Sequence, residues 1–67
     1  MKVNINGKMT EITKDTTVVD LIIKLCGTNP VGVAVAKNGQ IIRRSQWNET
    51  TIEEGDSLEI LHATSGG

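Results

Sequence analysis

Apolar and polar residues alternate at the start of the chain, where Val3 and Ile5 stand between polar neighbours. This period of two predicts a β-strand with one buried face. The dipeptide Asn6-Gly7 follows and favours a tight hairpin, because asparagine and glycine both tolerate positive φ angles. We therefore expect a return strand at about residues 8–13, with Ile12 facing the core.

The spacing of apolar residues then changes to that of an α-helix. One apolar stripe at helical spacing is formed by Val18, Leu21, Ile22 and Leu25. Thr17 precedes the stripe as an expected N-cap, and Asp20 places a negative charge where a helix N-terminus favours one. Gly27 suits a left-handed C-cap, and Pro30 prevents continuation. The pattern predicts one amphipathic helix with its apolar side against a sheet.

Two more strands and a second hairpin are expected after the helix. Residues 31–37 form a run of β-branched residues and alanine, and Asn38-Gly39 repeats the hairpin dipeptide. A fourth strand should follow at residues 40–43, carrying Ile41 and Ile42. Residues 45–48 are expected to form a turn or a short irregular piece that holds Trp47.

The last strand is expected at Ser57–His62, with Leu58 and Ile60 facing inward and Glu59 and Leu61 facing outward. The order of elements predicts an α+β domain in which one helix packs on a mixed four- or five-stranded sheet. We expect the last strand to lie parallel to the first, in the middle of the sheet. The domain should cover residues 1–62, and residues 63–67 should form a flexible C-terminal tail that ends in Gly-Gly.

Composition limits the possible partners. The 67 residues suffice for one domain, and the net charge is −1. Binding to nucleic acid needs a clustered positive field, so we expect no such partner. One stretch is acidic, either as an ordinary solvated surface or as a patch that steers a basic partner toward the C-terminal end. Its members are Glu49, Glu53, Glu54, Asp56 and Glu59.

Cys26 is the only cysteine, so no internal disulfide can form and nothing indicates secretion. The longest apolar run is far too short to span a bilayer, and we expect a cytoplasmic protein without membrane contact. Cys26 near a helix C-terminus lacks an activating environment, which favours a half-buried structural side chain over a persulfide acceptor. A single histidine, His62, cannot define a metal site. We expect His62 to cover the edge of the core without a catalytic role.

Several segments carry a resemblance to a known family. They are residues 17–21, 33–42, 43–47, 54–56 and 65–67, together with Leu58 and Ile60. With the order of elements, they resemble the ubiquitin-like β-grasp fold and, within it, the ThiS family of bacterial sulfur-carrier proteins of thiazole (thiamine) synthesis. Members of that family commonly have proline at position 43 and alanine at position 65, where this chain has Arg43 and Ser65. Neither difference touches the terminal carboxylate.

The resemblance implies that the carboxylate of Gly67 is adenylated and then converted to a thiocarboxylate, and that Gly66 and Ser65 enter a channel of the partner. It implies a ThiF-like adenylating enzyme, a ThiG-like thiazole synthase and a cysteine desulfurase as partners. No phosphate-binding GxxxxGK[ST] or GxGxxG motif occurs in the sequence. We therefore expect a carrier rather than an enzyme, with no cofactor of its own and with ATP held by the partner. We also expect the free carrier to be a monomer.

Four residues are candidates for a docking surface. Leu61, on the outward face, should join Ala34 and Ala36 in an apolar patch for the adenylating enzyme. Trp47 either packs over the rim of the core or belongs to this surface, where tryptophan is over-represented. The adjacent Arg43 and Arg44 point to opposite faces of a strand end and are interpreted as solvated surface.

Three other functions use the same fold. The first is a sulfur carrier for another acceptor, such as the small subunit of molybdopterin synthase, although this chain lacks the Phe-containing, Pro-rich ending usual there. The second is a ubiquitin-like modifier that joins Gly67 to lysine side chains. The third is a plain β-grasp interaction module whose terminal glycines are incidental, as frayed termini usually are.

Overall fold

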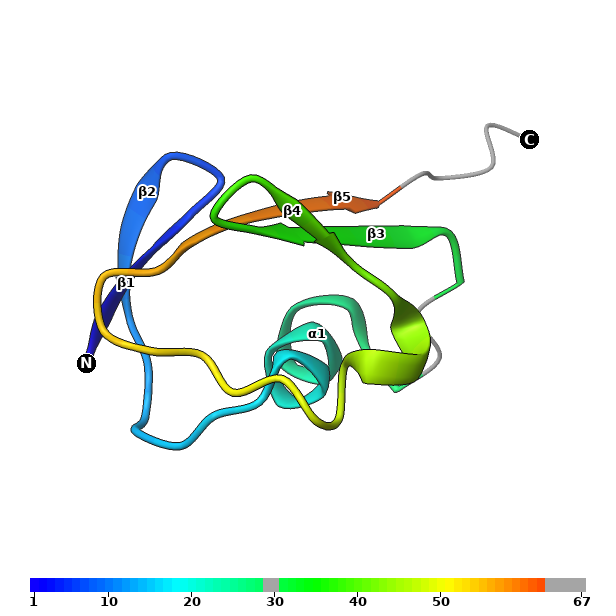
Figure 1. The fold of residues 1–67 in the computed structure, drawn as a ribbon, viewed down its shortest axis with the longest axis horizontal. Helices are drawn as coiled ribbons and strands as arrows, with labels where there is room; N and C mark the ends of the chain where they lie inside the picture. Colours follow the sequence, from blue (N-terminus) through cyan, green and yellow to red (C-terminus); the bar gives the residue numbers. More distant parts are fainter. Residues whose placement is uncertain (29–30, 63–67) are drawn as a thin grey trace.

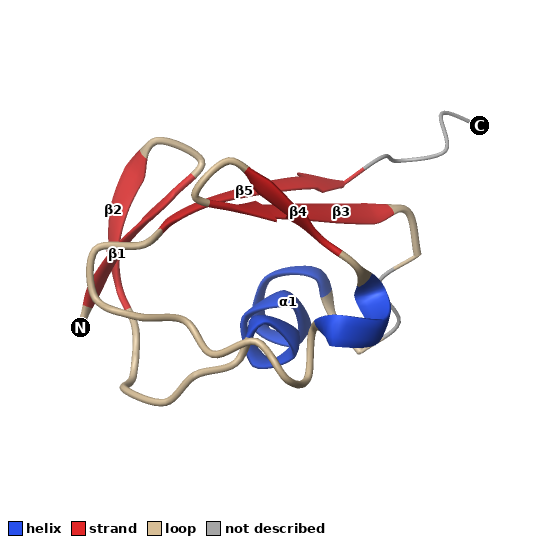
Figure 2. Ribbon diagram, in the orientation of Figure 1, coloured by secondary structure: helices blue, strands red, loops and turns tan. Residues whose placement is uncertain are grey.

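Five strands and one α-helix form two layers in the computed structural model, which describes residues 1–28 and 31–62 (Figure 1). The elements are β1 (Lys2–Ile5), β2 (Lys8–Glu11), α1 (Val18–Cys26), β3 (Val33–Lys37), β4 (Gln40–Ile42), the 3₁₀ helix η1 (Arg44–Gln46) and β5 (Ser57–His62). The helix covers one face of the sheet, as Figure 2 also shows. The expected α+β class, with one helix on a mixed sheet, is confirmed.

The sheet has the order β2-β1-β5-β3-β4, which places the last strand in the middle. β5 runs parallel to β1 and antiparallel to β3. The outer pairs, β1 with β2 and β3 with β4, are antiparallel hairpins. The central position of β5 and its parallel direction relative to β1 are as expected.

Both hairpin dipeptides adopt the backbone that their residue types favour. Asn6 and Gly7 have φ angles of 52° and 85°, and Asn38 and Gly39 have φ angles of 51° and 84°. Positive φ at both central positions matches the right-handed twist of the flanking strands. These two local signals therefore fix the register of both hairpins.

The helix begins as expected, but a different residue of its last turn faces the core. Thr17 accepts from Asp20 N–H at 3.3 Å, and Thr17 N–H donates to the Asp20 carboxylate at 3.3 Å, which completes a capping box. Gly27 has the expected positive φ, 88°, although its ψ of 179° lies outside the left-handed helical region. Leu25, expected in the core, is 52% exposed. Partly buried Cys26 packs against the core instead, because the buried row follows i, i+4 spacing through Ile22 to Cys26.

The core lies between the helix and the inner face of the sheet. It includes Leu58 and Ile60 of β5, as expected, and two residues of the irregular segment that connects β4 to β5. The buried apolar residues are Val3, Ile12, Val18, Leu21, Ile22, Val35, Trp47, Ile52, Leu58 and Ile60. Within residues 1–28 and 31–62, no helix is long and apolar enough to cross a lipid bilayer.

Candidate functional site

The expected apolar residues meet on the face of the sheet that points away from the helix. Ala34 of β3 lies opposite Leu61 of β5, and Ala36 of β3 lies opposite Ile41 of β4. Leu61 is 68% exposed and Ile41 is 72% exposed. We call these four residues the outer patch. The structure thus brings Leu61, Ala34 and Ala36 together, while their role in docking stays a prediction.

Ile41 is a member of the outer patch that the sequence analysis did not assign to it. Ile41 and Ile42 are adjacent on β4, and adjacent residues on a strand point to opposite faces. Val35 pairs with Ile42 on the core side, whereas Ala36 pairs with Ile41 on the outer side. The signal was present, because one of two adjacent isoleucines on a strand with one buried face must point outward.

A shallow hollow of about 90 Å³ lies within the outer patch. Its lining residues are Ala34, Val35, Ala36, Ile41, Glu59 and Leu61. The two alanines lie on the middle strand of the three, between larger side chains on β4 and β5. Pockets for small molecules usually enclose about 300–1,000 Å³, so this hollow suits a single side chain of a protein partner rather than a cofactor.

Trp47 does not belong to the outer patch. Its side chain is 3% exposed and packs in the core. The indole Nε1–H donates to the carbonyl of Ile42 at 3.0 Å, and the Arg44 guanidinium lies 5.3 Å from the ring centroid. Of the two roles considered for Trp47, the structure favours packing, and the docking alternative is wrong because a ring enclosed in this way offers no surface to a partner.

The second half of β5 is held by an asparagine side chain where β1 ends. β1 pairs with β5 through Ile5 and Leu58, and its backbone then turns away. Asn6 Oδ1 accepts from Ile60 N–H at 2.8 Å, and Asn6 Nδ2 donates to the carbonyl of Ile60 at 3.1 Å. β3 pairs with the other edge of β5 as far as His62. β5 is therefore bonded on both edges up to Ile60, close to the point where residues 63–67 begin.

Asp56 anchors the opposite end of β5. Its carboxylate accepts from Asn38 Nδ2 at 3.0 Å and from Glu53 N–H at 2.8 Å, and Lys37 Nζ lies 3.7 Å away. Burial alone would raise the pKa of Asp56, but the hydrogen bonds from Glu53 and Asn38 and the charge of Lys37 outweigh burial and lower this pKa from 3.8. The network ties the β3–β4 hairpin to the turn before β5.

The acidic stretch does not form a single surface at the end of the chain. Asp56 is buried and paired with Lys37, whereas Glu59 lines the hollow of the outer patch. Glu53 and Glu54 line another hollow beside the N-terminus, at the other end of the sheet from the end of β5 (Figure 1). These residues therefore do not form one continuous acidic patch that could steer a basic partner toward the end of the chain.

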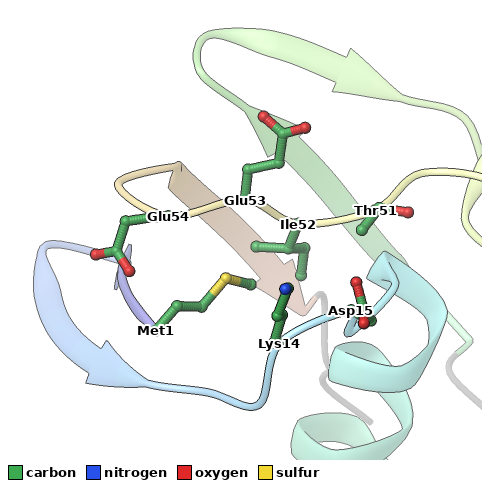
Figure 3. A pocket seen from close by; sticks show the side chains of 7 residues that line it. All are labelled: Met1, Lys14, Asp15, Thr51, Ile52, Glu53 and Glu54. Carbon is green, nitrogen blue, oxygen red and sulfur yellow. The ribbon is translucent and has the colours of Figure 1, made fainter.

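The hollow beside the N-terminus measures about 500 Å³. Figure 3 shows the Met1 and Ile52 side chains extending toward each other, with carboxylates around them. The lining residues are Met1, Lys14, Asp15, Thr51, Ile52, Glu53 and Glu54. The Glu54 carboxylate already accepts from Lys2 N–H at 3.2 Å. No nucleophile paired with a general base lies among these lining residues, so the hollow offers no evident catalytic chemistry.

The remaining candidates have structural or solvated positions. Cys26 is free and partly buried, in agreement with the expected packing role. His62 is exposed, so the expectation that it covers the edge of the core is wrong; it pairs with Val33 at the very end of the β3–β5 ladder. In the part of the chain that the structure describes, no group of three or more His, Cys, Asp or Glu residues could hold a metal ion. Ser65, Gly66 and Gly67 lie outside the described residues.

Comparisons of this chain with known proteins agree on one family. Residues 3–67 match the model of the ThiS family. The sulfur carrier protein ThiS of Escherichia coli is 28% identical, with both chains covered completely. ThiS of Bacillus subtilis is 34% identical over 64 residues, which are 94% of this chain and 96% of that protein.

Two further similarities concern a longer protein and a solved structure. A thiazole synthase of Paramagnetospirillum magneticum is 34% identical over all 67 residues, and the chain spans only 20% of that protein's length. The crystal structure of the thiamine biosynthesis protein ThiS of Geobacter metallireducens has a TM-score of 0.83 and 29% identity, with both chains covered completely.

Proposed function

The chain belongs to the ThiS family, and from this premise we propose that it is a sulfur carrier in thiamine biosynthesis whose Gly67 carboxylate holds the sulfur. The observation that carries the proposal is the full-length similarity to two proteins named as sulfur carriers. The fold agrees with it, since a solved ThiS structure superimposes over the complete chain.

The chemistry has two steps. A carboxylate is a poor electrophile, so a partner enzyme first joins a carboxylate oxygen of Gly67 to the α-phosphorus of ATP, and pyrophosphate leaves. The persulfide sulfur that a cysteine desulfurase provides is reduced to sulfide by two thiols, which become a disulfide. This sulfide then forms a C–S bond with the carboxyl carbon of Gly67, and AMP leaves with the electrons of the C–O bond. The product is a thiocarboxylate. This chain is a co-substrate in both steps and not an enzyme, and ATP is bound by the partner.

The body of the protein supports this chemistry by presenting the tail. β5 lies in the centre of the sheet and is bonded on both edges up to Ile60. The outer patch includes Leu61, which stands near the end of the same strand. The five residues after His62 can span at most about 17 Å. A partner that docks on the outer patch would therefore have its active site within this reach.

We propose a thiazole synthase as the sulfur acceptor, an adenylating enzyme of the ThiF type as the activating partner and a cysteine desulfurase as the sulfur source, all in the cytoplasm. The support for the acceptor is the similarity of this chain to one fifth of a protein named thiazole synthase. A thiazole acceptor also distinguishes the proposal from a carrier for molybdopterin synthesis.

Growth without thiamine tests the proposal in a strain whose own copy of this gene is deleted. The intact chain should restore growth, whereas a variant that lacks Gly66 and Gly67 should not, although its circular dichroism spectrum and melting temperature should be unchanged. Full rescue by the shortened variant would refute the role of Gly67. If the deletion strain grew without thiamine and immunoblots of the intact chain showed a ladder of higher-mass conjugates, the chain would instead be a protein modifier.

A further inference from the structure

A single carboxylate stands among the aliphatic side chains of the outer patch. Glu59 of β5 lies opposite Ala36 of β3, and Ala36 in turn lies opposite Ile41 of β4. These three residues form one row across three strands. The Glu59 side chain lines the same hollow as the four members of the outer patch. The hollow therefore has a small alanine floor, aliphatic walls and one negative charge at its side.

The charge of Glu59 is not balanced by a neighbour. Across residues 1–28 and 31–62, no hydrogen bond or ion pair engages its carboxylate. The one lysine of β3, Lys37, lies opposite Leu58 on the core side of the ladder and pairs with Asp56. Gln40 and Ile41 add no positive charge from β4. An uncompensated carboxylate beside exposed apolar side chains gains most from a cation that a partner brings.

The geometry points to an arginine of the adenylating enzyme as the group that fills this hollow. Aliphatic side chains of the enzyme next to that arginine would pack on Leu61 and Ile41. The stem of an arginine packs on apolar surface while its head remains free to pair. Its planar guanidinium matches a carboxylate through two parallel hydrogen bonds. The small side chains of Ala34 and Ala36 leave room for the stem, and the volume of about 90 Å³ fits one side chain. Glu59 is thus a specificity-determining residue, and this inference rests on the proposed function.

The experiment compares Glu59→Gln and Glu59→Lys with the wild-type chain. Glu49→Gln is the matched control, because Glu49 is also exposed and its carboxylate has no partner among the described residues. Each glutamine variant loses one negative charge, so a general charge effect would be equal in both. The probe is the ThiF-type enzyme of the same genome. Three quantities are measured at low and high salt: the Kd of the complex by calorimetry, and kcat and KM for ATP-dependent pyrophosphate release.

We expect Glu59→Gln to raise Kd and KM about tenfold at low salt with kcat unchanged, and Glu59→Lys to raise them further, because a like charge then meets the arginine. The difference from wild type should shrink at high salt, where exposed charges are screened. Glu49→Gln should stay within about twofold of wild type.

Equal Kd values for Glu59→Gln and Glu49→Gln at low salt would overturn the inference. Unchanged affinity of Glu59→Lys would do the same. The two proposals fail separately: a wild-type chain that binds the enzyme but releases no pyrophosphate contradicts the proposed function, while the Kd comparison still decides the role of Glu59. A wild-type chain that does not bind the enzyme contradicts both.

Discussion

The side chain of Asn6 should be worth more to stability than its exposed turn position indicates. It makes two hydrogen bonds with Ile60, at 2.8 and 3.1 Å, where β1 no longer accompanies β5. Each hydrogen bond contributes about 1 kcal/mol net, so their removal should cost about 2 kcal/mol. For a domain of this size that corresponds to a melting temperature lowered by roughly 8–16 °C.

The perturbation is Asn6→Gly, since glycine keeps the positive φ of 52° without strain. Asp15→Gly is the matched control, because Asp15 also has positive φ, 68°, and no side-chain hydrogen bond among the described residues. Both variants lose a side chain and gain the same freedom in the unfolded chain. The control should therefore change stability by less than about 1 kcal/mol.

Thermal and urea unfolding measure both variants, and amide hydrogen exchange locates the effect. Exchange of the Ile60 amide should accelerate in Asn6→Gly and not in Asp15→Gly. If the two variants lost the same stability, the asparagine would have no role beyond its turn, and the view that it extends the β1 ladder onto β5 would be refuted.

Three further predictions use the core, a buried carboxylate and the outer patch. Leu58→Ala should lower the free energy of unfolding by about 2–5 kcal/mol, since Leu58 is fully buried. Leu61→Ala, on the outer face, should change it by less than about 0.5 kcal/mol. Equal losses of the two variants in urea unfolding would contradict the assignment of Leu58 and Leu61 to opposite faces. The pKa of Asp56 is lowered from 3.8, so the stability that this carboxylate contributes is present above that pH and is lost as pH falls through the folded pKa. The free energy of unfolding, measured from pH 6 to pH 2, should therefore decrease less steeply for Asp56→Asn than for wild type. The difference should arise at about pH 4 and below. Ile41→Ser should raise KM for the adenylating enzyme severalfold without a change in melting temperature, and an unchanged KM would remove Ile41 from the docking surface.

Much of the fold follows from signals that are local in the sequence. Asn6-Gly7, Asn38-Gly39 and the Thr17–Asp20 capping box each act within four residues, and each is present in the structure as expected. Such motifs depend on backbone geometry and on nearest neighbours. They can therefore be recognised without knowing what packs against them.

The parts that the sequence did not predict depend on distant partners. The exposure of Leu25 depends on which side chains the rest of the chain covers, and so does the choice between the two roles considered for Trp47, packing and docking. Ile52 belongs to the core from an irregular segment, held by its N–H bond to the carbonyl of Thr16 at 2.9 Å, and no periodicity marks it. The outer patch was predicted in part, because strand alternation gives the face of Leu61, whereas the contribution of Ile41 needs the β3–β4 register.

The central claim is that Gly67 is charged with sulfur by partner enzymes. Intact-mass spectrometry tests it most directly, after incubation of the chain with ATP, a ThiF-type enzyme, a cysteine desulfurase and cysteine. We expect a mass increase equal to the exchange of one oxygen atom for sulfur, located at Gly67 by fragmentation and absent without ATP. An unchanged mass in the presence of the active enzymes, or an added sulfur located at Cys26, would contradict it.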